Sequence, residues 1–340
     1  MKTLAAWALL ALLAAMGHAA NAATVLLRPG GSLQQALREA VDGDTIEIAA
    51  GDYRGEVGVV TQKVLTLRGV GGRPVFHAAG RSAEGKAILV VRDGAVRIEN
   101  LEFRGARVPD RNGAGIRFER GRLEVLRCSF VDNENGILTA GFAEAELRIE
   151  DSDFSQAPPD TPLPHLLYVG ALGKLTVLRS RFSGGMQGHL LKSRARISEV
   201  RDSRFVDGPG GQAAYELEFP NGGLVTVIGN VIGQGAGTSN PGIVSYGTEG
   251  YADRPHSFTF IDNTVINESP RPAYFLRVRE ASPAVEQRIE RNRFYGAGDP
   301  GPADAARGAD GPNGNTQAPL SSLPSSLSRA LPGALPAGSR

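Results

Sequence analysis

The sequence predicts an all-β fold, a right-handed parallel β-helix (a solenoid of stacked coils) with a short N-terminal capping helix. Three observations predict it. A short phrase recurs eight times, one position of that phrase carries mostly small or amide residues, and an amphipathic helix precedes the first copy. Repeats of roughly 23 to 33 residues built from short strands and turns are typical of parallel β-helices. Leucine-rich repeats need a Leu-rich consensus that is absent here, propeller blades are longer, and the near-absence of long helical periodicity excludes helical repeats.

The repeated phrase is an apolar residue, two mostly polar residues, a small or amide residue, any residue, and then Phe or another apolar residue. Several copies follow an alternating strand such as Leu123–Val125, which has one inward and one outward side. The closing residues of successive copies lie 23 to 33 positions apart. The copies are Ile98–Phe103, Val125–Phe130, Ile149–Phe154, Val177–Phe182, Val200–Phe205, Val227–Ile232, Phe260–Val265 and Ile289–Phe294.

The fourth position of the phrase predicts a ladder along the solenoid. Stacked Ser and Asn side chains in one register can bond to the next coil at a tight corner. Only the first copy departs, with Leu101. On this interpretation Cys128 is one rung rather than a catalytic thiol, and as the only Cys it forms no intramolecular disulfide. The rungs are Cys128, Ser152, Ser180, Ser203, Asn230, Asn263 and Asn292.

One helix is predicted over residues 32–41. Ser32 is a good N-cap, Gln35 stands where a capping box needs it, and apolar residues follow at helical spacing. A strand begins at Ile46 after the turn 42–45. A solenoid exposes apolar core and unpaired strand edges at its ends, so this helix is expected to cover the first coil.

Both ends of the chain differ from the repeats. Lys2, an apolar run from Leu4 to Met16 and a small-x-small site at Ala20–Ala22 predict a cleavable signal peptide over residues 1–22. The run is too short for a membrane span, which takes about 20 residues. The β-helix domain is expected over residues 23–295. Residues 296–340, rich in Gly, Pro, Ala and Ser, predict a disordered tail.

Charge and composition limit the classes of molecule that the protein is expected to bind. The formal net charge is +1, and loss of Lys2 with the signal peptide makes it 0. A neutral surface with well-mixed charges argues against nucleic acid as a binding partner. The mature chain contains no second apolar run, so no membrane span is predicted in it. The only Trp, Trp7, lies in the signal peptide, so aromatic contacts to a sugar would come mainly from Tyr.

Residues 32–53 resemble the N-terminal cap of the pectin-lyase-like superfamily of right-handed β-helix proteins, and the repeats from about Leu65 to Phe294 are similar to its coils. The superfamily includes polysaccharide lyases, polygalacturonase-type hydrolases, pectin esterases, alginate epimerases and non-catalytic members, so the resemblance implies the fold and leaves the activity open. The sequence lacks a polygalacturonase-like Asp cluster, an Asp-Pro-His-Asp motif and Asp-rich calcium clusters. We therefore expect no cofactor and no metal.

A candidate site follows from aligning the coils. Segments 165–170 and 189–194 both begin His-Leu-Leu and lie 24 residues apart. Equivalent positions of neighbouring coils are roughly 4.8 Å apart, so His165 is expected to stack on His189, and Tyr168 on Lys192. Arg194 follows two residues later. Such a density of titratable groups is unusual for the outward positions of this chain.

The next coils add polar residues to this surface. If Tyr215 faces the core, Glu216 and Glu218 are expected to point outward, beside Lys192 and Arg194. The following coil carries Ser245, Tyr246 and Glu249. The expected substrate-binding residues are His165, Tyr215, Glu216, Glu218, Asn221 and Tyr246.

These groups suit β-elimination of a uronate polysaccharide. The reaction needs a cation to neutralise the substrate carboxylate, a base for the proton beside it, and an acid for the leaving oxygen. Arg194 is the expected neutraliser, Lys192 or His189 the base, and Tyr168 the proton donor. A neighbouring Arg lowers the pKa of a Lys, whereas a neighbouring Glu raises it.

Three functions remain open from the sequence. The first is a polysaccharide lyase, exported to the periplasm or secreted, that binds and cleaves an acidic polysaccharide. The second is a non-catalytic β-helix that binds polysaccharide or serves envelope assembly, in which the charged residues form a cross-coil ion-pair ladder. The third is a glycoside hydrolase that uses Glu216 and Glu218 as its carboxyl pair.

Overall fold

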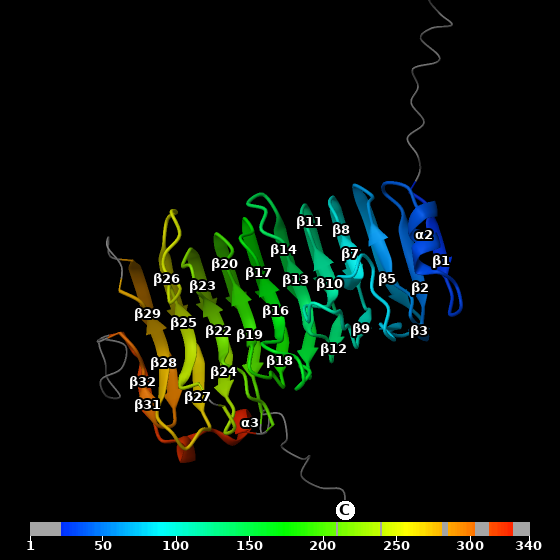
Figure 1. The fold of residues 1–340 in the computed structure, drawn as a ribbon. Helices are drawn as coiled ribbons and strands as arrows, with labels where there is room; N and C mark the ends of the chain where they lie inside the picture. The colour runs from blue at the N-terminus through cyan, green and yellow to red at the C-terminus, as the bar shows by residue number, and fades with distance from the viewer. Residues whose placement is uncertain (1–21, 209, 239, 281–284, 303–312, 329–340) are drawn as a thin grey trace, which may run out of the picture.

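The computed structural model describes residues 22–208, 210–238, 240–280, 285–302 and 313–328. Its strands form three parallel sheets, and each strand pairs with the equivalent strand of the next coil. The coils stack in chain order into one elongated solenoid (Figure 1). The predicted parallel β-helix is thereby confirmed.

Sheet A contains 11 strands and forms one long face of the solenoid. In order they are β1 (Thr24–Leu27), β2 (Thr45–Ala49), β5 (Val64–Val70), β8 (Ala95–Glu99), β11 (Arg122–Leu126), β14 (Glu146–Glu150), β17 (Lys174–Leu178), β20 (Ile197–Arg201), β23 (Leu224–Ile228), β26 (Ser257–Ile261) and β29 (Glu286–Glu290).

Sheet B also contains 11 strands, most of them three residues long, and they follow the ladder corner. They are β3 (Asp52–Arg54), β6 (Val75–His77), β9 (Glu102–Arg104), β12 (Ser129–Val131), β15 (Asp153–Ser155), β18 (Arg181–Ser183), β21 (Arg204–Val206), β24 (Val231–Gln234), β27 (Thr264–Asn267), β30 (Arg293–Tyr295) and β32 (Thr316–Ala318).

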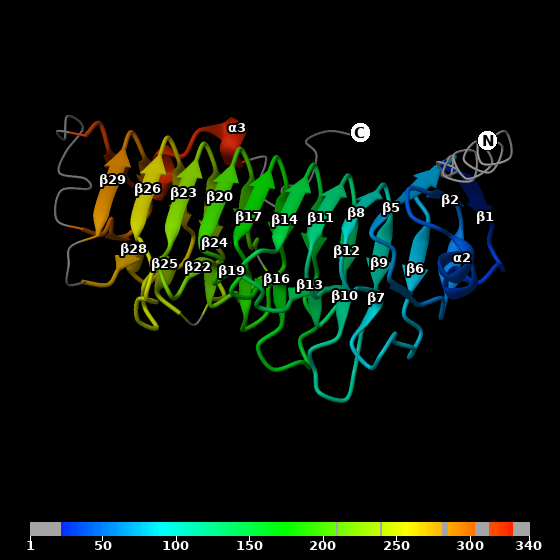
Figure 2. The same ribbon diagram turned by 90° about the horizontal axis from the view of Figure 1, so that it is seen from above.

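Sheet C contains 10 strands and lies apart from sheet A when the solenoid is seen from above (Figure 2). Its strands are β4 (Gly58–Val60), β7 (Ala87–Val91), β10 (Ala114–Phe118), β13 (Asn135–Thr139), β16 (His165–Val169), β19 (His189–Ser193), β22 (Tyr215–Phe219), β25 (Gly242–Tyr246), β28 (Ala273–Val278) and β31 (Gly298–Asp299).

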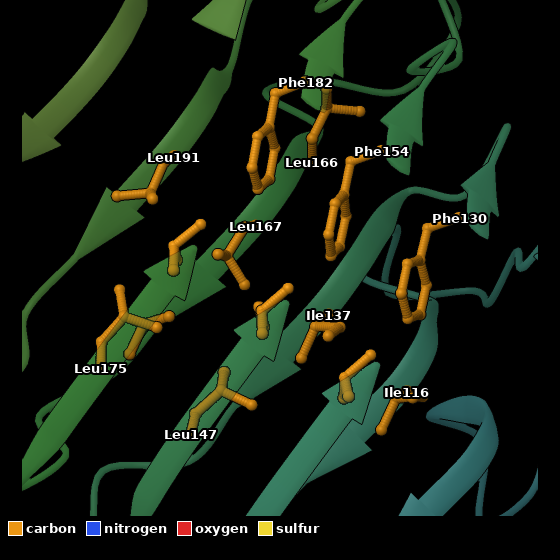
Figure 3. Packing of buried hydrophobic residues seen from close by; sticks show 14 of the residues in the cluster. Ile116, Phe130, Ile137, Leu147, Phe154, Leu166, Leu167, Leu175, Phe182 and Leu191 are labelled. Atoms are coloured by element: carbon orange, nitrogen blue, oxygen red, sulfur yellow. The ribbon is translucent and has the colours of Figure 1, made fainter. Parts of the chain in front are cut away.

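Aromatic residues stack inside the solenoid, and five of them are Phe residues that close the repeated phrase. Seven rings lie in one row with successive centroids 4.5 to 5.8 Å apart. Three of them, Phe130, Phe154 and Phe182, lie parallel beside Leu and Ile side chains (Figure 3). Stacked pairs contribute about 0.5–1.5 kcal/mol each beyond burial. The row consists of Tyr53, Phe76, Phe103, Phe130, Phe154, Phe182 and Phe205.

The predicted ladder is confirmed. The backbone N–H of Cys128 donates to Ser152 Oγ (3.1 Å), that of Ser203 to Asn230 Oδ1 (2.9 Å), and that of Asn230 to Asn263 Oδ1 (2.9 Å). The residue before a rung has positive φ, for example 51° at Arg127, which forms the tight corner. Burial raises the pKa of Cys128 to about 12, so its thiol stays protonated.

The predicted capping helix is present as α2 (Leu33–Glu39). Ser32 Oγ accepts the backbone N–H of Gln35 at 3.4 Å, while the Gln35 side chain donates to Glu39 at 2.8 Å. Leu33 and Leu37 are buried. The helix packs on β4, the edge strand of sheet C, and so covers the first coil as expected.

The solenoid continues past residue 295, where the sequence predicted the tail to begin. Asn315 Oδ1 accepts the backbone N–H of Asn292 (2.9 Å), adding a rung, and β32 pairs with β30. A 3₁₀ helix, η1 (Leu320–Ser322), and the short helix α3 (Ser325–Ser328) follow. The predicted tail therefore starts too early, because backbone pairing and one Asn outweigh a Gly- and Pro-rich composition. Residues 303–312 and 329–340 lie outside the described residues.

The predicted signal peptide also lies outside the described residues, apart from Ala22. No helix in the described part of the chain is both long and apolar enough to cross a membrane.

Candidate functional site

The site lies on the outer face of sheet C, on β16, β19 and β22 in the middle of the solenoid (Figure 1). Tyr168 pairs in register with Lys192, and Lys192 with Glu218, as the repeat alignment predicted for the first pair. The same outward column continues through Ser245 to Arg277. Stacking of parallel strands therefore brings residues from five coils into one line.

A second outward column carries rings. The ring centroids of His165 and His189 are 4.8 Å apart, and those of His189 and Tyr215 are 5.5 Å apart with nearly parallel planes. The expected stacking of the two His residues is confirmed. The Tyr215 hydroxyl accepts a hydrogen bond from Arg277 Nη1 (3.1 Å). Tyr215 thus faces outward, and the expectation that it faces the core was wrong.

Both His residues are held neutral. His165 Nδ1 accepts the backbone N–H of His189 (3.0 Å), which requires an unprotonated nitrogen at that atom. Burial and the charges of Lys192 and Arg194 lower the pKa of His165 to about 3. Burial, then the neighbouring His165 and the same two cations, holds the pKa of His189 well below its usual range.

Two cations and two carboxylates form the centre of the site. Lys192 Nζ lies 2.8 Å from Glu218 Oε2 and 2.7 Å from Glu249 Oε1. Arg194 Nη2 lies 2.7 Å from Glu249 Oε2. His189 Nε2 lies 3.2 Å from Glu218 Oε2. One carboxylate, that of Glu249, therefore bridges both cations.

Arg194 makes further polar contacts around this centre. Its Nε donates to the Tyr168 hydroxyl (3.1 Å), and its Nη1 donates to Asn221 Oδ1. The guanidinium also lies 6.0 Å from the centroid of the Tyr168 ring. Arg254 Nη1 donates to the backbone carbonyl of Arg194 (3.1 Å). The planar fork is fixed on several sides, which suits recognition of a planar carboxylate.

The contacts fix the charge states of these groups. Burial favours neutral Lys192, yet the hydrogen bonds to Glu218 and Glu249 outweigh it and raise the pKa of Lys192 above its usual value. Burial likewise lowers the pKa of Arg194, but its contacts with Tyr168 and Glu249 raise the pKa by more. Burial raises the pKa of Glu249, and the two cations lower it by more. At neutral pH Lys192, Arg194 and Glu249 are all ionised.

Two residues expected in the site lie inside the solenoid instead. Glu216 and Tyr246 are both 0% exposed. Glu216 shares its register position with Leu190, whose neighbour Leu191 pairs with Leu217. In β19 both Leu190 and Leu191 lie in the hydrophobic core, so strict alternation fails at this position. Neither Glu216 nor Tyr246 can touch a ligand on the outer face.

Glu216 is a carboxyl group in an apolar interior. Among the described residues, neither of its side-chain oxygens has a hydrogen-bond partner. Burial, followed by the negative charge of Asp207, holds its pKa well above the usual range. The hydrolase interpretation loses its carboxyl pair, because Glu216 and Glu218 lie on opposite sides of the strand.

Glu249 was expected only as a polar residue of the following coil, and its contacts with Lys192 and Arg194 were not predicted. This residue follows β25, two coils beyond Lys192, in the loop 247–256 that folds back over sheet C. No local sequence pattern indicates how far a loop reaches over a neighbouring sheet. Within the described residues, no group of three or more His, Cys, Asp and Glu side chains is arranged to hold a metal ion.

No protein-family model and no curated protein matches the chain. Among solved structures, the chain is similar to the PL6 family alginate lyase AlyGC, with a TM-score of 0.57 and 15% identity. The match covers 81% of this chain and 40% of that chain. A second match is the pectate lyase Pel9A, with a TM-score of 0.49 and 12% identity over 84% of this chain and 78% of that one. At 15% identity the likeness to AlyGC shows a shared fold. The chain therefore has a parallel β-helix fold, which it shares with AlyGC.

Proposed function

We propose that this protein is exported, to the periplasm or the cell exterior, and binds an acidic, uronate-containing polysaccharide on the outer face of sheet C, which it cleaves by β-elimination. One observation carries the proposal. Lys192 and Arg194 hold a single carboxylate between them, at 2.7 Å from each cation. A uronate unit presents the same chemical group.

The shape of the face supports binding of a polymer. Two outward columns, one of rings and one of polar groups, run along the solenoid axis through β16, β19 and β22. Neighbouring coils lie roughly 4.8 Å apart, so a chain molecule laid along the columns meets one ring and one polar side chain at each coil. The fold likeness to an enzyme described as an alginate lyase agrees with this proposal.

The geometry supports a proposed role for each residue in the elimination. Arg194 neutralises the substrate carboxylate, which acidifies the proton on the adjacent carbon. A base removes that proton, the electrons form a carbon–carbon double bond, and the glycosidic oxygen leaves. Tyr168, whose hydroxyl lies 3.1 Å from Arg194 Nε, donates a proton to this oxygen. Lys192 stabilises the developing negative charge.

The charge states distinguish the two base candidates. Lys192 is ionised, so it must lose a proton before it can accept one. His189 is neutral, with its pKa lowered, but its nitrogens lie 3.1 Å from His165 Nδ1 and 3.2 Å from Glu218 Oε2. We assign the base to His189, because it accepts a proton without first losing one. His189→Ala then abolishes cleavage while retaining polymer binding.

Non-catalytic polysaccharide binding is the second candidate function. It is favoured by the closed ion-pair network, in which two carboxylates hold Lys192 charged and largely buried. In that case the polymer is retained in a pull-down but remains intact.

The test is product analysis over a panel of acidic polysaccharides. A lyase produces unsaturated ends that absorb ultraviolet light, a hydrolase produces reducing ends without that absorbance, and a binding protein produces neither. Lys192→Ala and Arg194→Ala should abolish the absorbance. Lys174→Ala is the matched control, because Lys174 pairs with Glu199 (3.0 Å) on sheet A, away from the site. Absorbance that persists in Arg194→Ala would contradict the assigned role.

A further inference from the structure

Glu249 is the outermost member of the charged cluster. Its side chain is 42% exposed, compared with 11% for Lys192 and 6% for Glu218. Arg194 is intermediate at 25%. A molecule that approaches the two cations from solvent therefore meets Glu249 first, whereas Glu218 lies beneath Lys192.

The backbone around Glu249 is anchored on both sides. The N–H of Glu249 donates to the carbonyl of Pro220 (3.0 Å), and Asn221 Nδ2 donates to the carbonyl of Gly250 (3.2 Å). The Tyr251 hydroxyl donates to the carbonyl of Arg279 (2.6 Å). None of these bonds uses the carboxylate of Glu249. The side chain can therefore turn away from the cations without opening the loop.

We propose that Glu249 occupies a carboxylate subsite in the free protein, and that an external carboxylate displaces its side chain to bind Lys192 and Arg194. This inference rests on the proposed function and adds a specificity-determining residue to it. Exchange of one carboxylate for another keeps both cations paired. A neutral sugar that displaced Glu249 would leave Arg194 without a carboxylate partner and Lys192 with Glu218 alone, so it is rejected.

Glu249→Ala tests the subsite without any polymer. Removal of the carboxylate leaves room for a small anion beside the two cations, so sodium acetate should raise the unfolding temperature of this variant by mass action. Wild type, in which Glu249 fills the position, should show no such rise. The double variant Glu249→Ala/Arg194→Met should not respond either, since one of the two cations is gone. Sodium chloride at equal ionic strength is the control for screening.

Glu249→Gln tests the competition with substrate. The amide keeps the size of the side chain but lacks the charge, so the affinity for oligomers of mannuronate, guluronate or galacturonate should rise about tenfold, since two partly exposed ion pairs are lost. Their carboxyl-reduced forms should gain nothing. Glu199→Gln on sheet A, which loses a similar ion pair to Lys174, should leave both affinities unchanged.

The two arms separate this inference from the proposed function. Acetate that stabilises Glu249→Ala, with tighter oligouronate binding by Glu249→Gln, supports the inference. If acetate has no effect on Glu249→Ala, the inference is overturned, even where the wild-type protein cleaves a polymer. If acetate stabilises Glu249→Ala but no variant binds any oligouronate, the carboxylate subsite stands and the proposed function fails.

Discussion

Two carboxyl groups two residues apart on β22 have opposite environments. Glu218 faces outward, 2.8 Å from Lys192 Nζ. Glu216 faces the interior, where Asp207 is its acidic neighbour and adds to its cost of ionisation. An ionised carboxylate without a partner is expensive to bury, so Glu216 is neutral in the folded protein. Burial also raises the pKa of Asp207 to about 6, although the backbone N–H groups of Gly185 and Ala213 bond to its carboxylate.

The pH dependence of stability follows from these shifts. In the unfolded chain Glu216 ionises near pH 4.3, whereas in the folded protein it ionises only well above that value. The folded state therefore binds more protons, and stability is lost as the pH rises from about 4 through the folded pKa. In Glu216→Gln the side chain does not ionise, so this loss of stability at high pH should disappear. Its free energy of unfolding should be similar to wild type at pH 4 and about 1–3 kcal/mol higher at pH 8, as measured by urea denaturation.

Glu199→Gln, a half-exposed substitution on sheet A, is the control and should show no such pH dependence. A Glu216→Gln variant that is less stable than wild type at pH 8 would show that Glu216 is ionised and paired in the folded protein.

At the scale of the element, each coil turns through the corner formed by the ladder. Asn263 lies in the middle of it. Its Oδ1 accepts both the backbone N–H of Asn230 (2.9 Å) and Asn230 Nδ2 (3.0 Å), and its Nδ2 donates to the carbonyl of Val227 (2.9 Å). With 1% of Asn263 exposed, water cannot replace these bonds.

Asn263→Ala should therefore destabilise the protein by roughly 1–3 kcal/mol for each buried group left without a partner. Asn263→Ser should lose less, because Ser180 and Ser203 perform the same role in earlier coils, where Ser203 Oγ accepts the N–H of Ser180 at 3.1 Å. Thermal unfolding measures both losses. Equal losses for Ala and Ser would indicate that the hydrogen bond to the next coil is not the source of the effect.

The elements show what the sequence could and could not predict. The repeat, the ladder and the capping helix were predictable, because each depends on a local pattern that recurs. The inward side chain of Glu216 was not predicted, since strict alternation was assumed for a strand in which Glu216 and Leu217 are both buried. The alignment of the coils already contained the information needed to predict it. When Tyr215–Phe219 is aligned with residues 189–193, Glu216 takes the position of Leu190, an apolar residue. No sequence pattern indicated that Glu249 contacts Lys192 and Arg194, since the conformation of a loop depends on contacts between residues far apart in sequence.

At the scale of the whole molecule, the solenoid needs covered ends. Helix α2 covers the N-terminal end at β4. At the other end, β32 covers β30, and Asn315 Oδ1 accepts from Asn292 N (2.9 Å) and Nδ2 (3.0 Å). Without this segment, sheet B would present the unpaired edge of β30.

A chain that ends at residue 312 should therefore unfold at a lower temperature than the full chain and should self-associate through the open edge. A chain that ends at residue 328 keeps β32 and should match the full chain in both respects. Light scattering and thermal unfolding of the two truncated chains compare them directly. Equal unfolding temperatures would show that β32 contributes nothing to the stability of the last coil.

The charge of the molecule as a whole is nearly balanced, at +1, so affinity for an anionic polymer has to come from the local pair Lys192 and Arg194. The most direct measurement is the dissociation constant, by calorimetry, of an acidic polysaccharide and of its carboxyl-reduced form, for wild type and Arg194→Ala. The account predicts that wild type binds the acidic form at least about tenfold more tightly, and that Arg194→Ala loses this preference. Equal affinity of the wild-type protein for both forms would contradict it.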